Sequence, residues 1–126
     1  MKTIIKTDKA PAPIGPYNQA ILAGNTLYIS GQIGINPATG EVAEGGVEEE
    51  TKQVMKNLQA ILSAADMSFK DVVKSSIFLS DMNDFRGVNG IYAAYFDSET
   101  APARETVEVG NLPKFVNVEI SMIAIK

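Results

Sequence analysis

The sequence predicts an α+β fold in which two helices cover one face of a six-stranded sheet. Two stretches carry apolar residues at helical spacing, and six shorter stretches have the alternating or β-branched composition typical of strands. In chain order these elements read β-β-β-α-β-α-β-β, with no repeat, low-complexity stretch or linker between them. We therefore expect residues 1–126 to form a single domain.

The first three strands are expected at residues 3–7, 17–22 and 26–33. Residues 10–16 read Ala-Pro-Ala-Pro-Ile-Gly-Pro, and each proline restricts its own backbone and that of the preceding residue. This segment should therefore be rigid and extended. Residues 23–25, Ala-Gly-Asn, should form the turn between the second and third strands, because glycine and asparagine tolerate positive φ.

The longer helix is expected at residues 47–65, whose apolar residues fall on one helical face. Glu48, Glu49 and Glu50 occupy its first turn, where the helix dipole favours negative charge. Three carboxylates could also suggest a metal site, but adjacent residues on a helix do not converge on one point. We interpret this run as the solvated start of a helix. A second helix is expected at residues 83–96, with a buried side formed by Phe85, Val88, Ile91, Tyr92, Tyr95 and Phe96.

The remaining strands are expected at residues 72–79, 101–109 and 115–125. Alternation places Arg104 and Thr106 on the same face of their strand. In the last strand the even positions are uniformly apolar and should face the core. The odd positions of that strand begin polar, with Asn117, Glu119 and Ser121.

We assign Arg104, Thr106, Asn117 and Glu119 to the sheet face that no helix is left to cover. That face also carries apolar residues. A half-apolar sheet face left bare is typical of a surface that meets another subunit. Self-association is therefore expected.

The composition excludes several classes of chemistry. The chain has no Cys, His or Trp, which removes thiol nucleophiles, disulfides, imidazole bases, Ser-His-Asp triads and nearly all structural zinc sites. Eleven basic residues stand against fifteen acidic ones, a balance that disfavours a dedicated nucleic-acid-binding protein. No apolar run approaches the ~20 residues needed to cross a bilayer, and the N-terminus lacks the apolar segment of a signal peptide. We expect a cytoplasmic protein that holds no metal.

Arg104 and Glu119 are the most informative charged residues. Each lies in the middle of a predicted strand, and Arg104 is one of only two arginines in the chain. A guanidinium is always charged and presents a planar fork of donors, which suits the binding of a carboxylate or phosphate. The residues alone leave two interpretations open for Arg104: a ligand site, or an ordinary ion pair with a nearby carboxylate.

Short motifs occur in order along nearly the whole chain. They are Ile14-Gly15-Pro16-Tyr17 with Gln19-Ala20, Ile29-Ser30-Gly31-Gln32-Ile33, Asn36-Pro37 with Thr39-Gly40, Val88-Asn89 with Tyr92, Pro102-Ala103-Arg104 with Val107, and Leu112-Pro113 with Val118-Glu119-Ile120. Any one of them alone would be a weak signal. Together they strongly resemble the Rid (reactive intermediate deaminase) family, also called YjgF.

This resemblance implies a chorismate-mutase-like α+β fold with a mixed sheet, in which the last strand lies between the third and the fourth. It also implies a homotrimer whose sites lie in the clefts between subunits. The implied reaction is hydrolysis of reactive 2-imino acids, such as 2-iminobutanoate and 2-iminopropanoate, or of their enamine tautomers, to 2-oxo acids and ammonia. Pyridoxal-phosphate dehydratases acting on serine and threonine release these substrates, and no cofactor is expected in this protein itself.

The resemblance also implies a role for each site residue. Arg104 would hold the substrate carboxylate with two hydrogen bonds, and Glu119 would position the attacking water. The backbones of Gly31 and Thr106 would bracket the imine; Thr106 stands where a Cys is common, which is tolerable if only its backbone acts. Three further side chains would complete the pocket: Tyr17, Ser30 and Asn89.

For three of these positions a structural role stays open. Tyr17 could be a strand aromatic with a hydrated hydroxyl, Ser30-Gly31 could form a bulge or a close backbone approach, and Asn89 could bond only locally.

Two other functions also stay open: an RNA-cleaving translation inhibitor, and a non-catalytic regulator that binds a metabolite. The acidic balance and the absence of histidine argue against the first. The presence of both Arg104 and Glu119 favours chemistry over the second.

Overall fold

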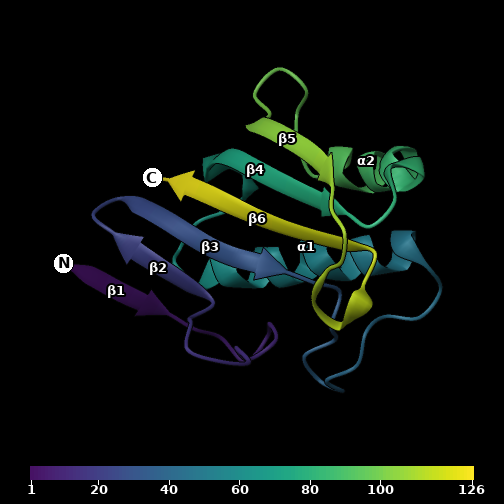
Figure 1. Cartoon of the computed structure of the whole chain (residues 1–126). Coiled ribbons are helices and arrows are strands. Elements are labelled where there is room, and N and C mark those ends of the chain that lie inside the picture. Colours follow the sequence, from purple (N-terminus) through teal and green to yellow (C-terminus); the bar gives the residue numbers. More distant parts are fainter.

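The computed structural model describes residues 1–126, and its strands and helices follow the predicted order (Figure 1). The strands are β1 Lys2–Ile5, β2 Ala20–Ala23, β3 Thr26–Gln32, β4 Val72–Leu79, β5 Ala103–Glu108 and β6 Val118–Ile125. The helices are α1 Val47–Ala64 and α2 Phe85–Ala93.

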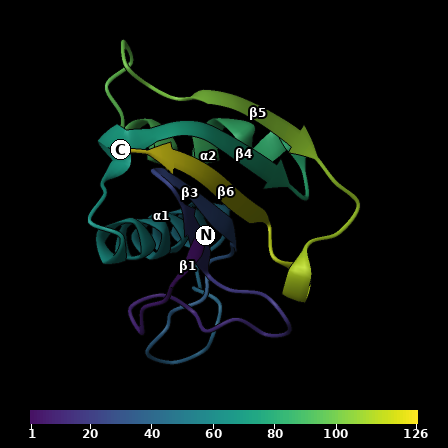
Figure 2. The same cartoon turned by 90° about the vertical axis from the view of Figure 1, so that its left-hand side faces the viewer.

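The six strands form one mixed sheet in the order β1-β2-β3-β6-β4-β5. Only the β4–β5 pair is parallel, and the other four neighbouring pairs are antiparallel. β6 therefore lies between β3 and β4, as the resemblance implies, and the strands that carry Arg104 and Glu119 do not pair. Both helices lie on the same face of the sheet (Figures 1 and 2), which confirms the predicted two-layer α+β architecture.

The core lies between helix α1 and the centre of the sheet. The middle of the apolar stripe predicted for this helix is fully buried, at Val54, Met55, Leu58, Ile61 and Leu62. The even positions of β6 are buried as predicted, at Val118, Ile120, Met122 and Ala124. Burying one leucine or isoleucine side chain stabilises a fold by roughly 1.5–3 kcal/mol, so β6 is a firmly held strand.

Strand β2 begins three residues later than the alternation pattern predicts, because Gln19 belongs to the preceding segment. Its side-chain amide accepts from the N–H of Thr7 and donates to the carbonyls of Thr7, Ala10 and Pro11. These four hydrogen bonds fold the proline-rich segment back against the start of the sheet. Residues 17–19 are consequently loop rather than strand.

Strand β6 also begins three residues later than predicted. Residues 113–115 form a tight turn in which Lys114 and Phe115 adopt positive φ, a conformation that no strand residue has. Helix α2 is shorter than predicted at both ends: residues 82–84 form a separate 3₁₀ turn, and the regular helix stops at Ala93.

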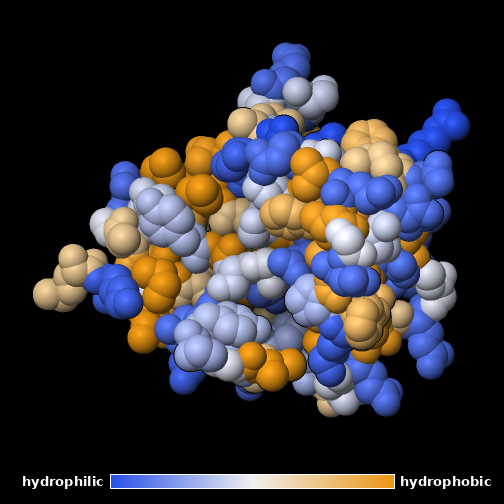
Figure 3. Space-filling model, viewed as in Figure 1, coloured by the Kyte–Doolittle hydropathy of each residue, from blue (hydrophilic) through white to orange (hydrophobic).

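The face of the sheet opposite the helices is uncovered and half apolar (Figure 3). One apolar row crosses β1, β2, β3 and β6, formed by Ile4, Ile21, Tyr28 and Ile123. Val107 and Ile125 lie in other rows of the same face, and Ile4, Tyr28, Val107 and Ile125 are each 40–52% exposed. Polar side chains lie among them, including Glu119 and Ser121. The predicted half-apolar open face is therefore present.

The prediction that Arg104 and Thr106 lie on this open face is wrong. In the β4–β5 register Arg104 is opposite Ser75 and Thr106 is opposite Ile77, and both partners are buried on the helix side of β4. Alternation correctly places the two residues on one face. It could not tell which face the helices cover, because that depends on where α2 crosses the sheet.

Asn117 also lies away from the open face. Its backbone N–H and its side-chain amide both donate to the carboxylate of Glu50 in α1, at 2.9 and 2.6 Å. Glu50 is only 4% exposed, so one member of the acidic run at the start of α1 is buried rather than solvated. This contact ties the start of β6 to the helix layer, two residues before Glu119.

Candidate active site

Arg104 lies on the helix side of β5, against one stripe of helix α2. Its Nη1 donates to Oδ1 of Asn89 at 2.7 Å, and its Cζ lies 5.1 Å from the ring centroid of Tyr92 and 5.7 Å from that of Phe85. The three contact residues are spaced i, i+4 and i+7, which places them on one face of the helix. We call Phe85, Asn89 and Tyr92 the contact stripe.

No carboxylate pairs with Arg104 within the chain. The ion pairs are Lys52–Glu49 and Lys74–Glu105, and the only side-chain hydrogen bond of Arg104 goes to a neutral amide. Arg104 therefore has no ion-pair partner in this chain, and the structure does not support the ordinary ion-pair interpretation. A guanidinium has five N–H donors, so most of the fork remains free to bind a planar anion.

Thr106 follows Arg104 on the same side of β5. Its hydroxyl oxygen is buried and has no hydrogen-bond partner. The N–H of Val109 donates to the carbonyl of Leu79 in β4, and backbone groups along a strand point alternately to either side. The N–H and C=O of Thr106 consequently point to the free edge of the sheet, where another molecule can bond them.

Glu119 lies on the open face of β6, beside an irregularity in β3. Between the paired residues Ile29 and Gln32 the strand carries both Ser30 and Gly31, whereas β6 carries only Ser121, so β3 has a bulge here. A side chain at Gly31 would collide with the Glu119 carboxylate. Ser30-Gly31 therefore forms a β-bulge, and Gly31 is also in close contact with the Glu119 side chain.

The Glu119 carboxylate has no hydrogen-bond donor or cation beside it in this chain. Burial raises the pKa of the Glu119 carboxyl above its ordinary value, and nothing opposes that effect. A half-buried carboxylate with a raised pKa is a better proton acceptor than an exposed one. Gly31 leaves the space that this carboxylate occupies.

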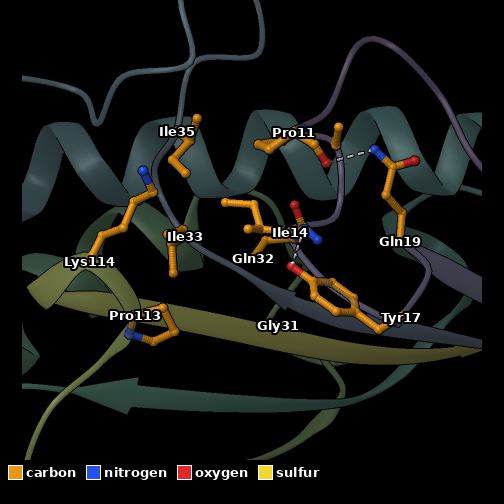
Figure 4. Close-up of a pocket in the computed structure, with 11 residues that line it drawn as sticks. Pro11, Ile14, Tyr17, Gln19, Gly31, Gln32, Ile33, Ile35, Pro113 and Lys114 are labelled. Carbon is orange, nitrogen blue, oxygen red and sulfur yellow. Dashed lines mark hydrogen bonds between the residues drawn. The ribbon is translucent and has the colours of Figure 1, made fainter.

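Tyr17 lines a cavity of about 400 Å³ next to Gly31 (Figure 4). Its hydroxyl accepts a hydrogen bond from the N–H of Ile14 at 3.3 Å, and its ring is half exposed. The other lining residues come from the proline-rich segment and Gln19, from the end of β3 and the residues just after it, and from the turn at residues 113–115; five of the eleven lining residues are hydrophobic. Ser30 does not line this cavity, and its hydroxyl donates to the carbonyl of Asn18 at 2.6 Å.

The candidate residues form two separate groups in one chain. Arg104, Asn89 and Thr106 lie on the helix side at the β5 edge, whereas Glu119 lies on the open face with the Ser30-Gly31 bulge. Strand β4 separates them, and Glu119 is level with Val107, three residues beyond Arg104. Strand and residue spacings put the two charged residues roughly 10 Å apart across the sheet and roughly 10 Å along it. A four-carbon imino acid cannot touch both within one chain.

Sequence reasoning missed two residues of the contact stripe as site residues, Phe85 and Tyr92. Both were assigned to the buried side of the second helix, and Tyr92 was also named in a family motif with Asn89, but neither was assigned to the site. Their spacing from Asn89, four residues on one side and three on the other, was the signal that could have linked them to that site residue.

No three acidic side chains converge on a point that could hold a metal ion. No helix is long and apolar enough to cross a membrane.

The chain is similar in sequence and in structure to known proteins of one family. The sequence model of the family described as endoribonuclease L-PSP matches residues 7–126. A RutC family protein from Pyrococcus horikoshii is 54% identical over 100% of this chain and 99% of its own length. A 2-iminobutanoate/2-iminopropanoate deaminase from Homo sapiens is 49% identical over 100% of this chain and 91% of its own. A protein of the conserved Rid family from Yersinia pestis has a solved structure with a TM-score of 0.96, 48% identity and full coverage of both chains. The chain belongs to the Rid, or YjgF, family, whose sequence model carries the endoribonuclease L-PSP description.

Proposed function

We propose that the protein hydrolyses 2-imino acids, including 2-iminobutanoate and 2-iminopropanoate, to 2-oxo acids and ammonia. The observation that carries this proposal is the Arg104 guanidinium, which is held by the contact stripe and has no carboxylate partner in the chain. A free, oriented fork at a sheet edge suits a ligand carboxylate. The human relative named as a deaminase of these two imino acids supports the choice of substrate.

In the proposed mechanism Arg104 binds the substrate carboxylate through two N–H groups. The backbone groups of Gly31 and Thr106 bracket the imine, and Glu119 orients a water molecule toward the imine carbon. As the water oxygen bonds to that carbon, Glu119 takes a water proton and the C=N π electrons move to nitrogen. The resulting amino alcohol is protonated on nitrogen and expels ammonia, while its hydroxyl loses a proton and becomes the ketone oxygen.

The residues present are chemically sufficient for this reaction. A protonated imine is already electrophilic, so positioning and one general base are the main requirements. General-base catalysis contributes roughly a hundred- to ten-thousandfold. The raised pKa of Glu119 supports its assignment as that base.

The proposal requires more than one copy of the chain. Arg104 and Glu119 are too far apart, and on opposite faces of the sheet, to act on one small substrate in a single chain. The half-apolar open face supports self-association. The family resemblance sets the expected number of subunits at three. The separation of the two charged residues within one chain implies that Arg104 of one subunit acts with Glu119 of another.

The family description as an endoribonuclease does not carry a second proposal. The chain has no histidine to act as acid and base, and its formal net charge is −4. Polyanion binding normally relies on a dense basic surface. The arrangement of Arg104 fits a single carboxylate better than a phosphate backbone.

The test couples a threonine dehydratase to semicarbazide trapping of the released imine. Active protein lowers the semicarbazone yield by removing the imine first. Arg104→Ala should abolish this effect, and Arg104→Lys should lose most of it, because a point charge cannot reproduce the planar fork. Arg86→Ala is the matched control, since it removes the only other arginine, which is exposed on α2.

Analytical ultracentrifugation of the same samples reports assembly. We expect about three times the chain mass of 13.5 kDa for the wild type and for each variant. A monomer would contradict the shared site. Full activity of a folded Arg104→Ala protein would contradict the role of Arg104, and ligand binding without any turnover would favour a regulator.

A further inference from the structure

Tyr92 holds a fixed position beneath Arg104. Its ring is 4% exposed, and its hydroxyl donates to Oγ of Ser75 at 2.8 Å. Ser75 is completely buried and is directly opposite Arg104 in the β4–β5 register. The ring is thus anchored at one end by helix α2 and at the other by the strand next to Arg104.

The contact between Tyr92 and Arg104 orients the guanidinium without neutralising it. An aromatic face attracts a cation through its quadrupole and uses none of the N–H donors. A carboxylate in the same place would occupy the fork and compete with a ligand. Burial raises the pKa of the Tyr92 hydroxyl, against the opposing effects of Ser75 and Arg104, so the hydroxyl stays protonated at neutral pH and remains a donor.

We propose that Tyr92, anchored by Ser75, is the positioning residue that aims Arg104 at the substrate carboxylate. This inference rests on the proposed function and adds a residue that acts through Arg104 rather than on the substrate. The carboxylate does not react, so its contact with Arg104 has similar strength in the ground state and in the transition state. Loss of such uniform binding raises KM and leaves kcat nearly unchanged.

The test compares three substitutions around the ring. Tyr92→Leu removes the aromatic face, and we expect KM to rise about tenfold with kcat within about twofold of wild type. Tyr92→Phe and Ser75→Ala keep the ring and remove only its anchor. Both should raise KM about two- to threefold, a small effect because the ring still contacts the guanidinium.

Phe96→Leu is the matched control for lost aromatic packing. The Phe96 ring lies 4.7 Å from that of Tyr92 and does not contact Arg104. A residue with a merely structural role lowers kcat by reducing the folded fraction, and it leaves KM unchanged. Phe96→Leu should behave in that way.

Calorimetric binding of the product 2-oxobutanoate gives a readout that does not depend on turnover. Its affinity should fall about tenfold in Tyr92→Leu and stay within about twofold in Phe96→Leu. Equal affinities in these two variants would overturn the inference. If Tyr92→Leu does not fold, unchanged KM in both Tyr92→Phe and Ser75→Ala would overturn it instead.

Arg104→Ala separates this inference from the proposed function. If Arg104→Ala loses 2-oxobutanoate binding while Tyr92→Leu keeps it, the positioning role of Tyr92 is contradicted and the proposed function is not. Unchanged 2-oxobutanoate binding in Arg104→Ala would contradict the assignment of Arg104 as the carboxylate-binding residue, and with it the proposed function.

Discussion

Gly31→Ala gives the sharpest test of where Glu119 acts. A methyl group at position 31 would meet the Glu119 side chain, with Cδ at 2.8 Å and Cγ at 3.1 Å, whereas an ordinary contact begins at 3.4 Å. The nearest atom is Oε2 itself. The carboxyl carbon must therefore move by at least about 0.6 Å, and the oxygen by on the order of 1 Å.

This displacement should reduce turnover far more than stability. Misplacing a catalytic group by about 1 Å costs up to about a hundredfold in rate. The Glu119 side chain is flexible and half exposed, so it can swing aside at little cost. Gly31 does not need positive φ, and replacing such a glycine stabilises a protein by about 0.4–1 kcal/mol through the unfolded chain. We expect kcat to fall by about a hundredfold and the melting temperature to stay within a few degrees of wild type.

The assay is the coupled imine trap, with thermal unfolding and ultracentrifugation on the same samples. Gly90→Ala is the matched control, because no atom lies within 4 Å of a Cβ built there and its φ is not positive. That helical substitution should leave turnover unchanged and stabilise the fold by about 1 kcal/mol. Normal turnover in a folded Gly31→Ala protein that assembles as the wild type does would refute the assignment of Glu119 as the positioned base.

Two further predictions concern groups that the site buries. Thr106→Val replaces a buried, unpartnered hydroxyl with a methyl group of similar size, so activity should persist and stability should stay equal or rise by about 1 kcal/mol; a large loss of turnover would show that the hydroxyl takes part. Glu119→Gln should lower turnover by roughly a hundredfold and keep 2-oxobutanoate affinity, because an amide is not a base. Burial raises the pKa of the Glu119 carboxyl in the folded protein above its value in the unfolded chain. The folded protein therefore loses stability as the pH rises from the unfolded-state pKa through the folded-state pKa, because the buried carboxyl must then ionise. Glu119→Gln should therefore melt above wild type at pH 7.5, and this difference should vanish near pH 4.

The sequence predicted correctly those parts of the fold in which a single hydrophobic pattern determines which residues are buried. The helical stripe of residues 47–65 and the apolar even positions of β6 each define a single buried face, and both are buried as predicted. Strand β4 begins and ends where its composition indicates. The starts of β2 and β6 could not be predicted in the same way. They depend on the tertiary hydrogen bonds of Gln19 and on the positive φ of Lys114 and Phe115.

The candidate site divides along the same line. The family motifs identified its candidate residues, but only the tertiary structure decides which of them are in contact. Asn89 was open to a purely local role, and the structure shows it bonded to Arg104 across fifteen residues of chain. The face of the sheet on which Arg104 lies was predicted wrongly. Alternation shows which side chains share a face, but it does not show which face α2 covers.

The separation of Arg104 and Glu119 has a physical consequence for how such a site can be built. If both residues faced one cleft of a single chain at ion-pair distance, they would bond to each other. The pair would lower the pKa of the carboxyl and occupy the guanidinium fork, so it would weaken both the base and the anion site. In this fold β4 and the thickness of the sheet keep them apart. Burial keeps the pKa of Glu119 high, and the neutral contact stripe leaves Arg104 without a counter-ion. Neither group is paired with the other within the chain, so both remain available to a substrate at the proposed shared site.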